Sequence, residues 1–258
     1  MKIRIYSILL VSVLLSLSVS AQGLKDEHKG VYRAYDFDAP RVDEPAPKGY
    51  DVFCLSHYGR HGSRFLYNEA EYDTLNVVLN RESLTATGEK VRDKFNENYP
   101  IFKGRAADLT ELGQKQHRLL ARRMMDDYPN LFRKGSEVYA FSSDRTRCMM
   151  SMYSFLDELR LCRNGLDIHA DYNSSYLKYL RAQHPEPFDM KAYLRDNFDP
   201  QSVFERLFTS PEKAMSSTDP WNFAQELYYY ASHLDGAGIK DDFCSNVLSD
   251  DEVKAIHR

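Results

Sequence analysis

The 258-residue sequence has few of the residues that mark several specialised protein classes. It contains four cysteines, 12 glycines and 10 prolines. Four cysteines are too few for a disulfide scaffold, and the low glycine and proline content excludes collagen-like and low-complexity chains. Basic residues do not exceed acidic ones, since 34 Lys and Arg face 38 Asp and Glu, so a general nucleic-acid binder is excluded. Hydrophobic residues at 43% are sufficient for the core of one large domain or two small ones.

The longest apolar run is also too short to cross a membrane. It extends from Ile8 to Val19, twelve residues, where a spanning helix needs about 20. Lys2 and Arg4 precede it, and the small-residue sequence Val19-Ser20-Ala21 follows it. This order predicts a signal peptide over residues 1–21, cleaved after Ala21, and therefore a secreted or periplasmic protein without a membrane span after cleavage.

Residues 22–48 are polar, contain three prolines near their end, and predict an irregular N-terminal arm. Residues 49–258 are expected to form one domain. Short runs rich in apolar and aromatic residues predict buried strands at Tyr50–His57 and Glu137–Ser143, and a weaker one at Leu166–Ala170.

Helical periodicity lies between and after these strands. One apolar face is marked by Leu112, Leu120 and Met124, in a helix that ends before Pro129. A second predicted helix has an apolar face that is marked by Met149, Met152, Tyr153, Leu156 and Leu159. Aspartates that precede prolines, at Asp199-Pro200 and Asp219-Pro220, predict further helix starts. The alternation favours an α/β core that carries a helical portion.

Two segments share one pattern, Leu84–Lys90 and Leu109–Lys115. Each begins Leu-Thr and has a glycine three residues after the threonine. A threonine in this position can cap backbone N–H groups, so both segments are interpreted as helix starts. Near the other end of the sequence, Ser249–Glu252 has the composition of a capping box and predicts another.

The most informative stretch is Ser56–Phe65, in which Arg60 and Arg64 flank His61. Guanidinium groups match the oxygens of a phosphoryl group, and the imidazole between them is suited to attack phosphorus and form a phosphohistidine. A loop whose arginines merely pair with surface acids is the alternative. A second element weighs against it, because Arg147 also follows a predicted strand and opens a predicted helix.

These residues resemble the histidine acid phosphatase branch (branch 2) of the histidine phosphatase superfamily, and most of all bacterial relatives of multiple inositol polyphosphate phosphatase, which act on phytate. In that family an Arg-His-Gly-x-Arg-x-Pro signature supplies two phosphate-binding arginines and the nucleophile, which match Arg60, Arg64 and His61. A third phosphate-binding arginine matches Arg147. The resemblance runs from about Pro45 to Ser151 and implies a phosphoglycerate-mutase-like parallel sheet core with a helical cap.

The sequence departs from the family pattern in two places. Leu66 occupies the position of the signature proline, and the expected proton-donor motif, His-Ala-Glu or His-Asp, is missing. Because family members are considerably longer, the resemblance implies an incomplete core, truncated at the C-terminus. His169-Ala170-Asp171 resembles the missing motif but comes on the strand after Arg147, where the family has nothing catalytic. A divergent, compact member that uses Asp171 or another carboxylate is the alternative.

No metal or cofactor is expected. The spacing of His57 and His61 suits a helical zinc site, but Gly59 and Gly62 indicate a strand running into a loop. The cysteines are interpreted as packing residues, with one disulfide involving Cys244 left open. Five further histidines have no partner at ligand spacing and are expected on the surface or in the core: His28, His117, His184, His233 and His257. The run Tyr228-Tyr229-Tyr230 is expected on one side of a packed helix.

The sequence thus predicts an exported phosphomonoester hydrolase that acts on a small phosphorylated molecule. Inositol polyphosphates, together with 2,3-bisphosphoglycerate, are the substrates that the resemblance implies, and Lys103 and Arg105 are candidate additional phosphate ligands. A broad-range phosphatase acting on sugar phosphates and a catalytically dead phosphate-binding relative are the alternatives. Nucleic acid is not expected as a partner, and the oligomeric state is left open.

Overall fold

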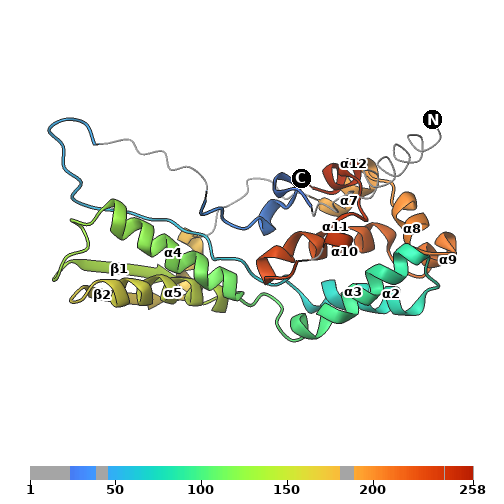
Figure 1. Cartoon of the computed structure of the whole chain (residues 1–258), viewed down its shortest axis with the longest axis horizontal. Helices are drawn as coiled ribbons and strands as arrows, with labels where there is room; N and C mark the ends of the chain where they lie inside the picture. The colour runs from blue at the N-terminus through green and yellow to red at the C-terminus, as the bar shows by residue number, and fades with distance from the viewer. Residues whose placement is uncertain (1–23, 39–45, 181–188, 241, 258) are drawn as a thin grey trace, which may run out of the picture.

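The computed structural model describes residues 24–38, 46–180, 189–240 and 242–257, so the predicted signal peptide lies outside the described residues. The molecule is elongated, with two groups of elements at opposite ends (Figure 1). We call them the sheet end and the helical end. The sheet end contains helices α4 and α5 and strands β1 and β2, at Glu111–Asp127, Thr146–Cys162, Glu137–Ser142 and Asp167–Tyr172.

The sheet end is built on a two-stranded parallel sheet. The two strands are joined by α5, because a parallel pair requires a long crossover. Residue pairs run in register from Glu137 and Asp167 to Ser142 and Tyr172. The predicted strands after Glu137 and Leu166 and their parallel arrangement are therefore confirmed, but the predicted burial is wrong, because only Ser142 of the two strands is buried.

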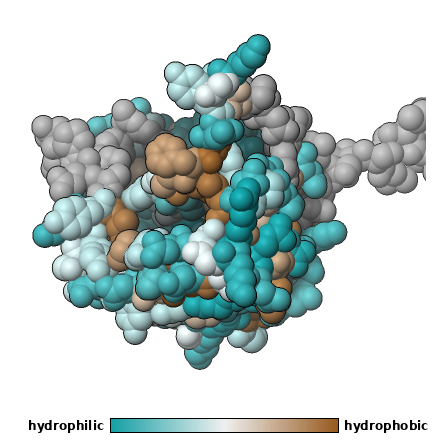
Figure 2. Space-filling model, turned by 90° about the vertical axis from the view of Figure 1, so that its left-hand side faces the viewer, coloured by the Kyte–Doolittle hydropathy of each residue, from teal (hydrophilic) through white to brown (hydrophobic). Residues whose placement is uncertain are grey.

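One face of the sheet packs on a small hydrophobic core, whose buried members are Ala121, Met125, Phe132, Leu156 and Leu159. Val138 and Ile168 contribute to it from the two strands. The other face is exposed, with Tyr139 at 60% and Phe141 at 57% of full side-chain exposure. Figure 2 looks at this end and shows brown hydrophobic residues at the surface among hydrophilic ones.

The helical end holds the larger core. Its helices are α2 (Glu69–Arg81), α3 (Ala86–Phe102), α7 (Met190–Asn197), α8 (Gln201–Leu207), α9 (Pro211–Ser216), α10 (Pro220–His233), α11 (Asp242–Ser245) and α12 (Asp250–Ile256). Aromatic rings dominate its interior: Tyr72, Phe95, Phe102, Phe204, Phe208, Phe223 and Tyr230 are all fully buried. Short helical segments complete the described chain: η1 (Asp26–His28), η2 (Gly30–Tyr32), η3 (Ser174–Tyr176), α6 (Leu177–Leu180) and η4 (Asp235–Ala237).

Helices begin at all three predicted places, and the cap is as predicted in two of them. Asp219 caps α10 through the backbone N–H of Asn222, and Ser249 and Glu252 form the capping box of α12. At α8 the cap is shifted, because Pro200 is itself the N-cap residue while the Asp199 carboxylate accepts from the Gln201 N–H at 3.0 Å.

The two Leu-Thr segments start α3 and α4, and each also binds a passing stretch of chain. The Thr85 and Thr110 hydroxyls accept from the glycine three residues on, at 3.1 Å in both helices. Thr85 also bonds the chain at Arg206 and Leu207, whereas Thr110 donates from its N–H and hydroxyl to the Ser63 carbonyl. In both segments the threonine therefore starts a helix and also holds a distant stretch of backbone against that helix.

The predicted strand at Tyr50–His57 is wrong. This segment forms no strand in the structure, and its Phe53 side chain is 92% exposed. The residue composition favoured a strand, but a strand also needs a neighbour to complete its hydrogen-bond ladder, and composition cannot supply one.

The cysteine predictions are borne out in part. Cys148 and Cys162 lie on α5, as expected, and none of the four cysteines forms a disulfide. Cys244 is buried and packs in the core, but Cys54 and Cys162 are exposed, so the packing interpretation is wrong for these two. Cys54 is exposed because the predicted buried strand around it does not form.

Candidate active site

Helix α4 and its N-cap residue Thr110 hold the loop that carries His61. The Ser63 carbonyl accepts two hydrogen bonds from Thr110, and the Ser63 N–H donates to the Gln116 side chain at 2.8 Å. The Gln116 amide also donates to the Ser63 hydroxyl at 3.0 Å. The buried His117 ring donates to the backbone carbonyl of Arg60. These bonds leave the loop backbone little freedom.

Helix α5 holds the loop from a second side. The Gly62 N–H donates to the Ser151 hydroxyl at 3.1 Å. The His57 ring stacks on Phe155, with centroids 6.1 Å apart and 10° between the planes. The His57 ring thus packs against α5, but it is also exposed and lines the pocket, so the expectation that it packs behind the nucleophile is met only in part.

Close backbone packing explains why glycines are required here. A Cβ on Gly62 would meet the backbone of Gly113, and a Cβ on Gly113 would meet the Ser63 carbonyl oxygen, both well inside the 3.0 Å that real Cβ atoms keep. Loop and helix can therefore approach at this point only because both residues lack side chains.

His61 has the orientation and charge state of a nucleophile. Its Nδ1 lies 2.9 Å from the Gly62 carbonyl oxygen. Because a carbonyl only accepts, Nδ1 carries the proton and the lone pair of Nε2 is free. Burial, more than any other cause, lowers the pKa of His61 to about 4; the bond to Gly62 opposes this and the nearby arginines add to it. The imidazole is therefore neutral at neutral pH.

The three predicted arginines gather around this ring. The charges of Arg60, Arg64 and Arg147 all act on the His61 pKa, and the pKa of Arg60 is lowered by burial and then by its two neighbours. The guanidinium carbons of Arg64 and Arg147 lie 5.6 and 5.4 Å from the centroid of one ring, Tyr67. The Nε atoms of both arginines are buried and without a partner. Two elements far apart in sequence thus bring positive charge to one place.

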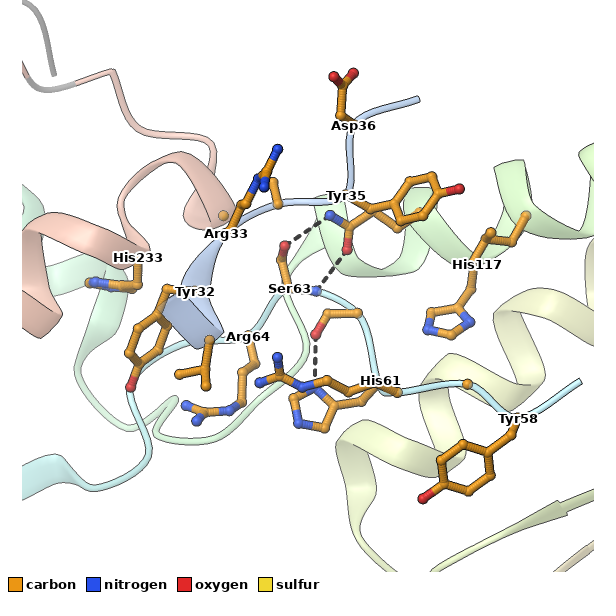
Figure 3. Close-up of a pocket in the computed structure, with 18 of the residues that line it drawn as sticks. Tyr32, Arg33, Tyr35, Asp36, Tyr58, His61, Ser63, Arg64, His117 and His233 are labelled. Carbon is orange, nitrogen blue, oxygen red and sulfur yellow. Dashed lines mark hydrogen bonds between the residues drawn. The ribbon is translucent and has the colours of Figure 1, made fainter. Parts of the chain in front are cut away.

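The loop opens onto a pocket of about 610 Å³ (Figure 3). One wall is the loop itself, including Arg60, His61 and Arg64, and another is α4 with Gln116 and His117. The third wall is the N-terminal arm, from which residues 31–36 line the pocket. Neither Arg147 nor Tyr67 is among the lining residues, but the charge of Arg147 acts on the pKa of His61.

Leu66 connects the loop to the core of the helical end. Its N–H donates to the Tyr72 hydroxyl at 2.9 Å, and that hydroxyl lies 3.1 Å from Nε2 of His233. His233 Nδ1 in turn donates to the Tyr230 carbonyl at 2.7 Å. A proline at position 66 has no N–H to give, which accounts for the departure from the family signature. The expectation that His233 lies in the core is confirmed.

Other residues singled out from the sequence lie elsewhere. Lys103 and Arg105 do not line the pocket, and Arg105 instead lies over the Phe65 ring at 4.4 Å. His169 and Asp171 are exposed on β2, also outside the pocket. Among the described residues, Asp36 is the one carboxylate in the lining, and in Figure 3 it points away from His61.

One group in the described part of the chain has the composition of a metal site. Glu137, Asp167 and His169 offer ligand atoms within 4.8 Å of one another on the exposed face of the sheet. This group lies outside the pocket.

Sequence reasoning missed several residues that shape the site. Gln116, His117, Ser151 and Tyr67 hold the loop or its arginines, and Tyr32 approaches from the arm. For the residues of α4 a signal existed, because the Leu-Thr pattern repeats immediately before them. Nothing in the sequence marks the approach of Tyr32.

A family comparison agrees with this geometry. Residues 59–230 match the histidine phosphatase superfamily (branch 2), and the chain belongs to this superfamily. Membership supports phosphatase activity in general. A search among curated proteins gives no match. No helix among the described residues is long and apolar enough to cross a membrane.

Proposed function

We propose that the protein is a phosphomonoester hydrolase in which His61 carries the phosphoryl group. One observation supports this above the others: a neutral imidazole with its Nδ1 fixed by Gly62 and its Nε2 free lies among three arginines. Burial also lowers the pKa of His233 to about 4, but its Nε2 lies 3.1 Å from the Tyr72 hydroxyl and is therefore not available to attack phosphorus.

The reaction follows from this arrangement. Nε2 of His61 attacks phosphorus, the bond to the ester oxygen breaks, and the oxygen leaves with a proton. Water then attacks the phosphohistidine, and inorganic phosphate and free His61 result. Arg60, Arg64 and Arg147 neutralise the charge on the phosphoryl oxygens in both steps.

The source of the proton decides between an efficient enzyme and a phosphate-binding relative without activity. General acid catalysis contributes about 10²- to 10⁴-fold in rate. Asp171 is exposed on β2 outside the pocket, and Asp36, the one carboxylate among the described residues that line the pocket, points away from His61 in Figure 3. We propose that the intact protein has a more complete core, which the exposed outer face of the sheet supports.

Inositol polyphosphates are the proposed substrates, and the proposal of export rests on the signal peptide that the sequence predicts over residues 1–21. The pocket of about 610 Å³ with several cations is compatible with a ligand of many phosphates. Sugar phosphates and 2,3-bisphosphoglycerate are the alternatives. Comparing phytate with glucose phosphate as substrates distinguishes the two classes.

The central test uses residues 22–258 and an aryl phosphate. We expect phosphate release, and an acid-labile, alkali-stable phosphoryl adduct when the reaction is quenched during turnover. His61→Ala should lose both while it melts like the wild type. His169→Ala, which removes an exposed ring on β2 outside the pocket, is the matched control and should still form the adduct. Undiminished turnover by folded His61→Ala would disprove the mechanism.

A further inference from the structure

The N-terminal arm is fixed to the helical end before it reaches the pocket. The Lys29 ammonium binds Asp235 of η4 and, at 2.8 Å, Asp26. The Tyr228 hydroxyl of α10 donates to the His28 carbonyl at 2.8 Å. Burial lowers the pKa of Lys29, but the two carboxylates outweigh it and the net shift is upward. Lys29 therefore stays charged, and the next residues have a fixed starting point.

Because the arm is anchored at Lys29, Tyr32 lies beside the pocket. Its ring packs against Tyr229, with centroids 5.8 Å apart, and edge-on against His233 at 6.3 Å. Burial raises the pKa of Tyr32, so the hydroxyl keeps its proton at neutral pH. In Figure 3 the hydroxyl end of the ring is turned toward the Arg64 side of the pocket.

Arg64 depends on its neighbours for its position. Its guanidinium carbon lies 5.2 Å from the centroid of the Tyr32 ring, and the guanidinium also interacts with the Tyr32 hydroxyl. On its other sides it donates from Nη1 to the Phe65 carbonyl at 2.7 Å and lies over Tyr67. Its Nε is buried and without a partner. No carboxylate of the described residues forms an ion pair with it; Glu71 is near enough for its charge to interact with Arg64, but it makes no direct contact with the guanidinium.

We propose that Tyr32 is a positioning residue for Arg64, and that the arm is thereby a part of the phosphate site. An aromatic ring and a neutral hydroxyl hold the guanidinium without cancelling its charge, as a carboxylate would, so the full charge stays available to a phosphoryl group. The inference rests on the proposed function, because it assigns Arg64 to phosphate binding.

Calorimetric titration with inorganic phosphate tests this proposal on residues 22–258. A partly desolvated cation–aromatic contact corresponds to about a tenfold change in affinity. We expect Tyr32→Leu to weaken phosphate binding about tenfold, and Tyr32→Phe, which keeps the ring, to stay within about threefold of the wild type. Unchanged affinity in folded Tyr32→Leu would overturn the proposal.

Phe37→Leu is the matched control. Phe37 is also an aromatic residue of the arm, but it does not line the pocket, and its ring packs on Tyr35 with centroids 4.5 Å apart. Its loss should leave phosphate affinity unchanged. An equal loss in both variants would mean that the arm acts only as a cover, against the proposal.

A double-mutant cycle separates positioning from a general structural effect. In an Arg64→Lys background, Tyr32→Leu should cost little further affinity, since the planar guanidinium has already gone. Additive losses would overturn the positioning role. If the wild type binds phosphate and the Arg64 variant binds equally well, the proposed function of Arg64 fails as well. A melting curve of each variant shows that the fold is retained.

Discussion

Gly113 of α4 lies directly against the carbonyl oxygen of Ser63, nearer than any side chain at that position would allow. Gly88 has the same relationship to the Leu207 carbonyl at the start of α3. The two glycines occupy equivalent places in the two Leu-Thr segments, but one supports the loop of His61 and the other supports the helical end.

This pair gives a matched prediction. Gly113→Ala should push Ser63 away and lower turnover by an order of magnitude or more, because small displacements of reacting groups are costly. Gly88→Ala should lower the melting temperature but leave the activity of the folded fraction nearly unchanged. Measuring turnover per folded molecule in both proteins checks this. Equal turnover in both would show that α4 does not control the loop.

The charge of Arg147 should not be sufficient for its role. Arg147→Lys keeps the charge but loses the planar fork, so rate and phosphate affinity should fall, the rate by about 10²-fold. Arg145→Lys, two residues away and exposed, serves as the control and should behave like the wild type. Steady-state kinetics decides the point, and unchanged kinetics for Arg147→Lys would place its side chain outside the reaction.

The Tyr72 hydroxyl connects the loop to the core and should contribute to stability. Tyr72→Phe leaves the Leu66 N–H and the His233 Nε2 without partners, which costs about 1 to 3 kcal/mol for such buried groups. Leu66→Pro should cost at least as much, because it removes the same N–H and a fully buried side chain. Urea unfolding measures both. A loss below 0.5 kcal/mol for Tyr72→Phe, roughly the scale of an exposed substitution, would contradict the network.

Acid should destabilise the protein through His233. Burial lowers the pKa of His233 to about 4, below the unfolded value of 6.5. The unfolded state therefore binds a proton first as the pH falls, so stability is complete above about pH 6.5 and is lost progressively down to about pH 4. Melting temperatures across this range test it. In His233→Gln the difference between pH 7 and pH 4 should shrink, whatever the absolute stability; an unchanged difference would point to other groups.

Activity should have its own acid limit. Because the pKa of His61 is also about 4, the nucleophile stays neutral well below neutral pH. Turnover should therefore persist at pH 5 and decline as the pH passes through about 4, provided that it is corrected for unfolded protein. A decline centred at 6.5 would mean that the imidazole is not buried in the working enzyme.

Local signals in the sequence predicted much of the structure. The strand after Glu137 and the helix that ends before Pro129 depend on short periodic patterns, and both are present. The convergence of Arg60, Arg64 and His61 was predictable because the three lie within five residues. Their catalytic roles stay predictions.

Interactions between distant segments were not predictable. The buried face of α4 includes Gly113, Gln116 and His117, whereas Leu112 and Leu120 are only partly buried, because this face holds the loop. The positions of the apolar residues alone therefore predicted the wrong buried face for α4. The approach of Tyr32 to Arg64 likewise depends on contacts between the arm and α10, which no local pattern reveals.

The anchoring of the arm has a consequence for the order of folding. The contacts that fix it join residues 200 to 225 positions apart in the chain, from His28 and Tyr228 to Lys25 and Asp250. Contacts of such separation require the closure of very long loops, and they form late. The loop of His61 and its supports on α4 are close in sequence and can form early. A chain at that stage would hold Arg64 without Tyr32, so phosphate affinity should reach its final value in the last step of refolding.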